Sequence, residues 1–471
     1  MGRATIKSGS INLLNTIIGA GILAMPYGLK SNGLLFGAIL IIWSSLTSAF
    51  GLYLQNKVAK YTQQQQAVSY FSLCQLTYPQ LSVIFDGAIA IKCFGVGVSY
   101  LVVIGDLMPK IMESLAVPET SVWMERNVWI TLFMVLMVAP LSYLKKLDSL
   151  KYTSVVALFS VVYLICLVVG HYVSDTIPGR EIDYIGPISW KLTLSSFPIF
   201  VFAYTCHQNM FAIINELTAD EKDGLTTRQA NLVIRNAIVT ACASYLIVGI
   251  LGYLTFGNAV NGNIITMYPK DSIPSLIGRL CIVVMVSLSF PLQCHPCRGS
   301  INHVIYFVRN GVKSGWKLRN SLVTTDGYSA LPDQTSQQSH DVESVCDESF
   351  VSTTPMEGAQ DTDGHDPIIV PLTTKKFYGI TTAIVIASYL VAITVKSLAH
   401  VLAFVGSTGS TSISFILPGL FGYMLIKPLN GATTLTGLER FCKYGGFALS
   451  VWGIVVMVVC LSVTIFLGAT H

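Results

Sequence analysis

The chain has 471 residues, of which 52% are apolar and only 11% are charged, whereas about a quarter of the residues of soluble domains are charged. With a mean hydropathy of +0.61, we expect an all-α polytopic membrane protein, and a soluble α/β enzyme is excluded. The net charge of +4 is too small to indicate a nucleic-acid partner. Arg3 and Lys7 precede the first apolar segment without a small-residue cleavage site, so we expect this segment to belong to the fold and not to a signal peptide.

Apolar runs near the roughly 20 residues needed to span a bilayer predict eleven transmembrane helices. They cover 8–29, 33–55, 81–107, 128–144, 152–173, 192–215, 231–255, 274–296, 377–396, 398–426 and 444–468. The fourth run is short, and the ninth and tenth are nearly contiguous. The predicted organisation is eight helices within 1–309, a disordered cytosolic loop at 310–374 and three helices within 375–471.

The first predicted helix is interrupted by its own sequence. Gly19-Ala20-Gly21 and Pro26 lower the helix propensity and remove a backbone donor midway through the apolar run. In hydrocarbon an unpaired N–H or C=O is costly, so irregular backbone persists only around a protein-lined cavity. Broken helices of this kind are where secondary transporters bind small solutes. The stretch is therefore the first candidate binding site.

Polar residues share one face of the same helix. Ser8, Asn12, Asn15 and Gly19 recur at spacings of three and four, which directs them towards other helices or water and away from lipid. A packing seam of small residues, with asparagine as an interhelical hydrogen-bonding group, has the same pattern. Pro26 favours the binding site over the packing seam.

Basic residues indicate the orientation of the chain. If the N-terminus is cytosolic, most of the 29 Lys and Arg residues lie in cytosolic loops or at the adjoining helix ends. The opposite side then holds only Lys30, Lys110, Arg126, Arg180, Lys191, Lys270 and Lys396. This bias predicts a cytosolic N-terminus and a C-terminus on the far side of the membrane.

The segment 310–374 differs in composition from the rest of the chain. Asn320–Thr374 is acidic, rich in Ser and Thr, and has no Lys or Arg. Such a composition cannot bury enough apolar surface to order itself. If the loop is regulatory, a kinase is its expected partner; an inert insertion explains the composition equally well.

The sixth predicted helix has a polar run in the middle of an apolar span. Pro198 is followed by Tyr204-Thr205-Cys206-His207-Gln208-Asn209, a run without glycine. If the first helix begins a five-helix unit, the sixth begins its inverted copy, so two interrupted helices predict one site between them. Free N–H groups at half-helix N-termini favour a carboxylate, and free carbonyls favour an ammonium group. The predicted ligand is therefore a zwitterionic amino acid.

Three motifs carry a resemblance to a known family. They are Asn15–Pro26, the run Ile91–Leu101 (IKCFGVGVSYL) and Tyr204–Asn209. In this order they resemble the amino acid/auxin permease family, and within it the fungal vacuolar amino acid transporters that export to the cytosol. The resemblance covers all eleven predicted helices. It implies a LeuT-like fold of two inverted five-helix repeats plus one helix, with proton-coupled movement of amino acids out of the vacuole.

Candidate site residues follow from the resemblance. The unwound segment Gly19, Ala20, Gly21, Ile22 and Leu23 would hold the α-amino and α-carboxylate groups of the substrate, with Asn15, Tyr204 and Thr205 beside it. Relatives that use sodium bind it with an asparagine of the first helix and a hydroxyl group of the eighth helix. Asn15 matches the asparagine, and Ser287 or Ser289 matches the hydroxyl group. Sodium thus stays open as the coupling ion. The proton gradient of vacuolar membranes favours a proton, and no other cofactor is expected.

Several titratable groups lie inside the predicted helices. His207 lies in mid-span and titrates near neutrality, although a buried neutral histidine that donates to a carbonyl is the commoner arrangement. We expect Lys92 to bond to backbone carbonyls of another helix, with contact to the substrate as the alternative, and Arg279 to reach the non-cytosolic interface. Cys294-His295-Pro296-Cys297 lacks the second ligand pair of a zinc site, so no metal is expected.

Together these features predict a secondary active transporter of amino acids, working by alternating access in the vacuolar membrane. The competing prediction is an amino acid-sensing membrane receptor that signals through the 310–374 loop. An enzyme is not expected, because no constellation of titratable residues has the spacing that catalysis requires. The sequence does not indicate which amino acid side chains are accepted.

Overall fold

The structure is a computed structural model that describes residues 4–63, 68–70, 73–74, 77–78, 81–144, 153–174, 180–218, 226–310, 372–428 and 435–468. Across these residues the chain is helical, and its one β pairing is an isolated bridge between Ala4 and Leu217. The predicted all-α class is therefore confirmed. The predicted 310–374 loop lies outside the described residues except at its two ends.

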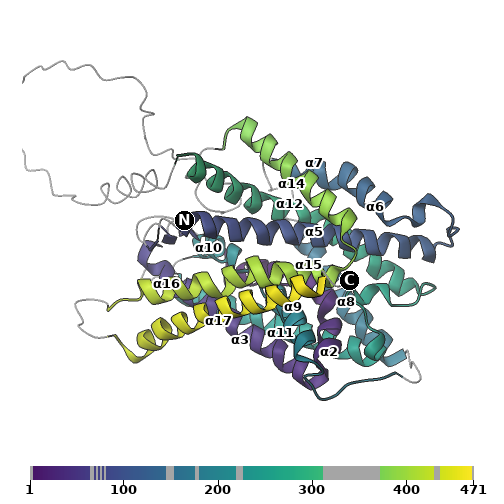
Figure 1. Cartoon of the computed structure of the whole chain (residues 1–471), viewed down its shortest axis with the longest axis horizontal. Coiled ribbons are helices and arrows are strands. Elements are labelled where there is room, and N and C mark those ends of the chain that lie inside the picture. The colour runs from purple at the N-terminus through teal and green to yellow at the C-terminus, as the bar shows by residue number, and fades with distance from the viewer. Residues whose placement is uncertain are drawn as a thin grey trace, which may run out of the picture.

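The helices follow one another along the chain as shown in Figure 1. In order they are α1 (Ile6–Ile17), η1 (Ala20–Ala24), α2 (Met25–Asn32), α3 (Leu34–Gln63), α5 (Ser82–Ser114), η3 (Val122–Met124), α6 (Arg126–Phe133), η4 (Met134–Val138), α7 (Ala139–Ser142), α8 (Thr153–Ser174), α9 (Trp190–Ala203), α10 (His207–Glu216), α11 (Thr227–Phe256), η6 (Gly257–Ala259), η7 (Ile264–Thr266), α12 (Ile273–Asn310), α14 (Thr374–Thr394), α15 (Leu398–Val405), η8 (Gly406–Ser410), η9 (Ser412–Ile416), α16 (Leu417–Leu425) and α17 (Gly437–Gly468).

The described part of the chain has enough apolar helices to cross a membrane repeatedly. Nine are long and apolar enough to do so, and a tenth span is formed if Ile6–Ile17 and Ala20–Asn32, which are bent by 48°, count as one. Arg126–Ser142 is a shorter apolar segment at the position of the fourth predicted helix. The protein is therefore a polytopic membrane protein. The predicted count of eleven requires both the bent pair and the short segment to cross.

Several helices run further than the hydropathy pattern predicts, among them α5 and α12. The third predicted helix, 81–107, continues in α5 to Ser114, and the eighth, 274–296, continues in α12 to Asn310. Pro291 and Pro296 lie inside α12 and do not end it, because a helix in a bundle can re-satisfy the carbonyls that a proline leaves unpaired. Hydropathy finds the apolar part of such a helix, whereas the helix itself extends beyond that part.

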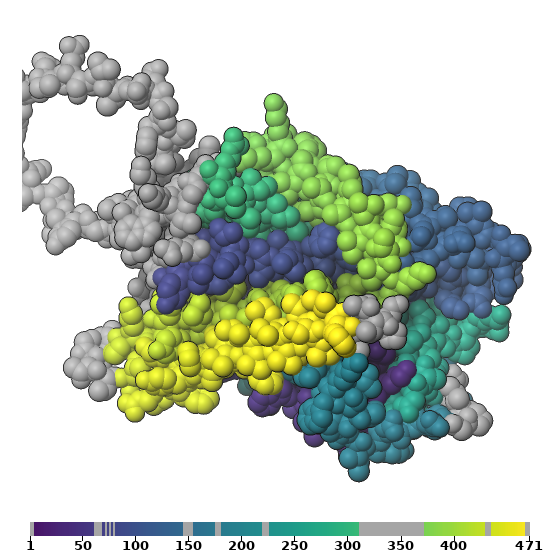
Figure 2. Space-filling view, viewed as in Figure 1, coloured from purple at the N-terminus to yellow at the C-terminus, as the bar shows by residue number. Residues whose placement is uncertain are grey.

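The interrupted helices lie between α5 and α11. The α5 helix packs along the length of α12 and also contacts α14, α15 and η8, while α11 packs on α1, α2 and α3. Between them, η1 touches α5, α9 and α11. The α17 helix packs on α16 and lies on the outer face in Figure 2, where α5 is visible above it. This arrangement buries η1 and the end of α9 in the interior.

Candidate functional site

The first helix breaks where the glycines predicted it. The α1 helix ends at Ile17, and Gly19 has φ −120° and ψ −144°, outside the helical region, before η1 begins. The carbonyl of Ile17 accepts a hydrogen bond from the N–H of Gly19 (3.1 Å) and one from the Tyr245 hydroxyl of α11 (2.8 Å). The predicted interruption of the first helix is therefore confirmed, and Tyr245 satisfies one of the carbonyls that it releases.

The sixth predicted helix breaks as well, without a glycine. The α9 helix ends at Ala203 and α10 begins at His207. Hydroxyl groups donate hydrogen bonds to the carbonyls near the break. Thr205 donates to Val201 O (2.7 Å), Tyr245 donates to Ala203 O (2.8 Å), and Ser48 donates to Tyr204 O (3.0 Å). Since an unpaired carbonyl inside hydrocarbon costs several kcal/mol (of order 4–8 in an apolar solvent), these hydroxyls stabilise a break that the local sequence alone does not require.

The two breaks are in contact with each other. A β-carbon on Gly21 would lie 3.0 Å from both Cα and Cβ of Ala203, so a side chain at this position would push η1 away from the end of α9. The Tyr245 hydroxyl is within hydrogen-bond distance of a carbonyl on each side. Asn209 of α10 also donates to the Thr16 hydroxyl of α1 at 3.1 Å. The four half-helices therefore meet at one junction.

The junction presents backbone groups of both polarities. The first N–H groups of a helix have no carbonyl partner within that helix, and neither η1 nor α10 has a side-chain cap. These N-termini carry partial positive charge, while the ends of α1 and α9 carry partial negative charge. The Tyr100 hydroxyl of α5 faces the first break, since a β-carbon on Gly19 would lie 3.3 Å from it. A zwitterion has complementary groups for such a junction.

The residues predicted to hold the substrate gather at this junction. Gly19 is partly buried, and the other residues of the group are buried, namely Ala20, Gly21, Ile22, Leu23, Tyr204 and Thr205. The Tyr204 ring packs edge-on against Tyr245 at a centroid distance of 5.0 Å. Asn15 lies one turn before the break and donates to the carbonyl of Ser154 in α8 at 3.1 Å, an interhelical bond of the kind that a packing seam uses.

The coupling candidates have partners of their own. His207 donates from Nε2 to the carbonyl of Ser48 at 3.2 Å, and its Nδ1 is buried with no hydrogen-bond partner among the described residues. Ser287 and Ser289 each donate to a carbonyl of their own helix at 2.7 Å. No hydrogen bond within the described ranges joins Asn15 to either serine.

Several residues at the junction are not distinguished by the sequence. Tyr245 and Ser48 lie in apolar helices, where such side chains are usually core residues, and nothing in their spacing sets them apart. Gly51 also lies in an apolar helix, and nothing in its spacing sets it apart. A β-carbon at this position would nevertheless lie 2.2 Å from the Ser414 carbonyl and 2.9 Å from His207 Nε2. Only the packing of α3 against the second break shows their role.

Two predictions for buried cations were wrong. Lys92 makes no hydrogen bond with any described residue, so it is not held by carbonyls of another helix. Arg279 does not reach water, because its side chain is fully buried. Its guanidinium donates to the carbonyls of Ile265 (3.3 Å) and Tyr268 (2.5 Å) and to the hydroxyl of Ser114 (3.0 Å). The loop between α11 and α12 supplies the two carbonyls and the end of α5 supplies the hydroxyl, so these groups replace the water that snorkelling would have reached.

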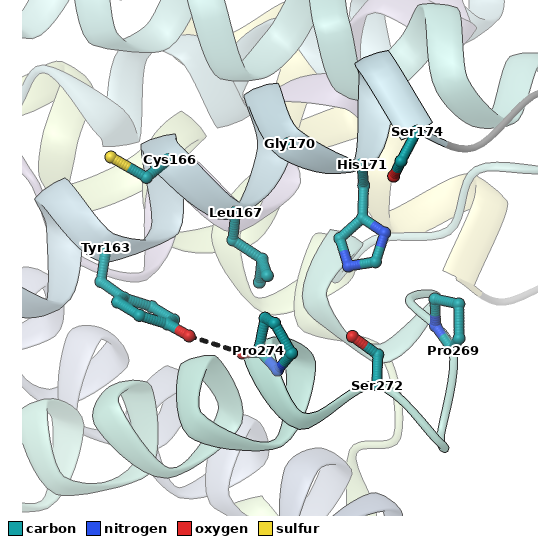
Figure 3. Close-up of a pocket in the computed structure, with 9 residues that line it drawn as sticks. All are labelled: Tyr163, Cys166, Leu167, Gly170, His171, Ser174, Pro269, Ser272 and Pro274. Atoms are coloured by element: carbon teal, nitrogen blue, oxygen red, sulfur yellow. Dashed lines mark hydrogen bonds between the residues drawn. The ribbon is translucent and has the colours of Figure 1, made fainter.

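A separate cavity lies away from the junction, where α8 approaches the start of α12. It has a volume of about 510 Å³, and in Figure 3 Tyr163, Leu167 and His171 extend from α8 towards the 269–274 segment. Tyr163 donates to the carbonyl of Pro274 at 2.9 Å. His171 pairs with Ser275 at 2.9 Å and stacks on Tyr268. None of the predicted site residues lines this cavity.

Comparison with known proteins identifies the family. The family model described as "Transmembrane amino acid transporter protein" matches residues 2–459. The chain belongs to this family. It is similar to vacuolar amino acid transporter 6 of Saccharomyces cerevisiae, with 45% identity over 99% of this chain and 100% of that protein, and to vacuolar amino acid transporter 5 of the same yeast, with 40% identity over 99% of each. Sodium-coupled neutral amino acid transporter 7 of Homo sapiens is 27% identical over 64% of each chain.

As a member of the transmembrane amino acid transporter family, the protein is a transporter and not an enzyme. The predicted resemblance is confirmed by the family match and by its yeast relatives. The comparisons give no support to the receptor alternative.

Proposed function

We propose that the protein is a secondary active transporter that moves amino acids across the vacuolar membrane to the cytosol, coupled to protons. The observation that carries the proposal is the contact between two broken helices, in which Tyr245 reaches the carbonyls of both Ile17 and Ala203. Two interrupted helices that meet at their breaks are the usual substrate site of a transporter built from repeats. The names of the yeast relatives support the amino acid substrate and the vacuolar membrane.

In the proposed mechanism the substrate lies across the junction. N–H groups at the start of η1, within the Gly19–Leu23 segment, donate hydrogen bonds to its α-carboxylate, and carbonyls at the ends of α1 and α9 accept hydrogen bonds from its ammonium group. Asn15, Tyr204 and Thr205 complete the proposed site. Two inverted five-helix repeats, one starting at α1 and the other at α9, then expose the junction alternately to either side. The excess of basic residues in the loops on the N-terminal side supports a cytosolic N-terminus.

The proposed coupling ion is a proton, with His207 as its candidate carrier. Its Nε2 is engaged by the Ser48 carbonyl, and its buried Nδ1 has no partner among the described residues, so protonation there would add a charge directly beside the second break. Sodium is the competing ion, with Asn15 and either Ser287 or Ser289 as its candidate ligands.

Reconstitution into liposomes tests the proposal. The purified protein is given each of the twenty standard amino acids in labelled form, with an imposed pH gradient, an imposed sodium gradient or neither. We expect uptake of at least one amino acid that the pH gradient drives and a protonophore abolishes. Uptake that depends on sodium would overturn the proposed coupling ion. Absence of uptake under every gradient would overturn the transport function itself.

A further inference from the structure

Lys92 is a buried cation to which no residue in the described part of the chain is paired. It lies in the middle of α5 with 3% of its surface exposed and forms no hydrogen bond or ion pair with any described residue. The two acidic residues nearest to Lys92 in the sequence of the same helix are engaged elsewhere: Asp86 contacts His303 at 3.3 Å, and Asp106 contacts Arg126 at 3.4 Å. A lone charge inside a membrane span is costly and points to a function.

The Lys92 side chain lies beside the second break. Its backbone packs on η8, because a β-carbon on Gly409 would lie 2.7 Å from Lys92 N and 2.8 Å from Lys92 Cβ. The same π-helical turn packs on α9, where a β-carbon on Gly406 would lie 2.0 Å from the Pro198 carbonyl. The Lys92 ammonium is within electrostatic range of Cys206, the residue that precedes α10.

Several polar groups around this break also lack partners. The N–H groups of His207 and Gln208, at the start of α10, make no hydrogen bond in the described part of the chain. The side-chain amide of Gln208 and the hydroxyl of Ser410, which follows Gly409, are likewise buried with no hydrogen-bond partner among the residues that the structure describes. An ammonium group and free helix N-terminal N–H groups share one preference, which is for an anion.

We propose that Lys92 is the internal counter-cation of the substrate carboxylate. The inference rests on the proposed function and deepens it: the α-carboxylate that lies on the η1 side of the junction is shared with Lys92 on the α10 side. Lys92 thereby makes a free carboxylate a condition for recognition, whichever side chain the substrate carries. The protein also needs no external cation to neutralise that carboxylate.

Substrate analogues and a Lys92→Met variant test this role. One amino acid that the wild type transports is chosen as the substrate. Two analogues are then tested as inhibitors of its uptake: the carboxylic acid that lacks the amino group and the amine that lacks the carboxylate. Methionine keeps the length of the lysine stem without the charge. We expect Lys92→Met to raise KM by about tenfold or more, as for the loss of a hydrogen bond to a charged group. It should also lose inhibition by the acid while keeping inhibition by the amine.

Each alternative gives a different outcome. If Lys92→Met keeps the wild-type KM and its inhibition by the acid, the inference is wrong although the proposed function stands. Equal loss of inhibition by both analogues would assign Lys92 a structural role and also overturn the inference. If the variant does not fold, a cryo-EM map of the wild type with bound amino acid tests the inference instead. We expect the carboxylate within hydrogen-bond distance of Lys92 Nζ, and a carboxylate beyond that distance would overturn the inference. If the wild type takes up no amino acid, the proposed function fails first.

Discussion

The Tyr245 hydroxyl lies 2.8 Å from the carbonyl oxygen of Ile17, the last residue of α1. The Tyr245 hydroxyl oxygen is also 2.8 Å from the carbonyl oxygen of Ala203, the last residue of α9. A phenol has one proton to donate, so it either shares that proton or alternates between the two breaks. One side chain of α11 therefore couples the two interrupted helices on which the proposed transport depends.

Replacing Tyr245 by phenylalanine removes this coupling and keeps the ring. A neutral hydrogen bond contributes about 0.5–1.5 kcal/mol, so we expect a decrease in substrate affinity of roughly 2- to 10-fold. The measurement is the KM of uptake in liposomes. Tyr163→Phe is the matched control, since it removes a hydroxyl that donates to the Pro274 carbonyl at 2.9 Å, away from the junction. An unchanged KM in Tyr245→Phe, or an equal change in the control, would refute the bridging role.

Gly51 is expected to be intolerant of any side chain. A β-carbon there would lie 2.2 Å from the Ser414 carbonyl and 2.9 Å from His207 Nε2, so Gly51→Ala must push α3 away from the second break. Overpacking of this kind typically costs about 1–3 kcal/mol, and we expect a lower melting temperature together with loss of most uptake. Gly379→Ala in α14 is the control, because nothing lies within 4 Å of its β-carbon position. Normal uptake by Gly51→Ala would show that this contact is dispensable.

Arg279 holds the loop after α11 in place through its planar guanidinium. Lysine keeps the charge but cannot make three hydrogen bonds in the same directions, so Arg279→Lys leaves buried carbonyls without donors. We expect a loss of stability of roughly 1.5–3 kcal/mol, measured as a lower melting temperature of the protein in detergent. Arg309→Lys, at the exposed end of the same helix, should melt like the wild type. Equal melting temperatures for the two variants would contradict this assignment.

The bond between Asn209 and Thr16 is a second link between the broken helices, 3.1 Å long. We expect Asn209→Ala and Thr16→Val each to lower uptake by a fewfold. The double variant should do no more than either single change, because both remove the same hydrogen bond. A double-mutant cycle on uptake rates checks this, and strictly additive losses would show that the two residues act separately.

The sequence predicts the two breaks to different degrees. Gly19, Gly21 and Pro26 destabilise the first helix by themselves, so its interruption follows from local chemistry. The second break depends on hydroxyls from α3 and α11, which are far away in sequence from the carbonyls of α9. A side chain such as Tyr245 in an apolar run has the pattern of an ordinary core residue, and only the assembled bundle shows which carbonyl it meets.

The same limit applies to the charged residues. Spacing along α5 correctly separates Lys92 from Asp86, but it does not show whether other elements provide acceptors for Lys92 and Arg279. For Arg279 the fold supplies three such acceptors, and for Lys92 none among the described residues. Burial of a cation is thus predictable from sequence, whereas the presence or absence of its partner is not.

Binding of labelled amino acids to the purified protein tests the central claim most directly, with Gly21 as the position that is changed. In Gly21→Leu the β-carbon of the new side chain would lie 3.0 Å from Ala203. The side chain must therefore push η1 away from the end of α9 or fill the space between them. Gly379→Leu, on an exposed helix face, is the control. We predict saturable binding to the wild type and to Gly379→Leu, and none to Gly21→Leu. Wild-type affinity in a folded Gly21→Leu protein would show that the amino acid binds elsewhere.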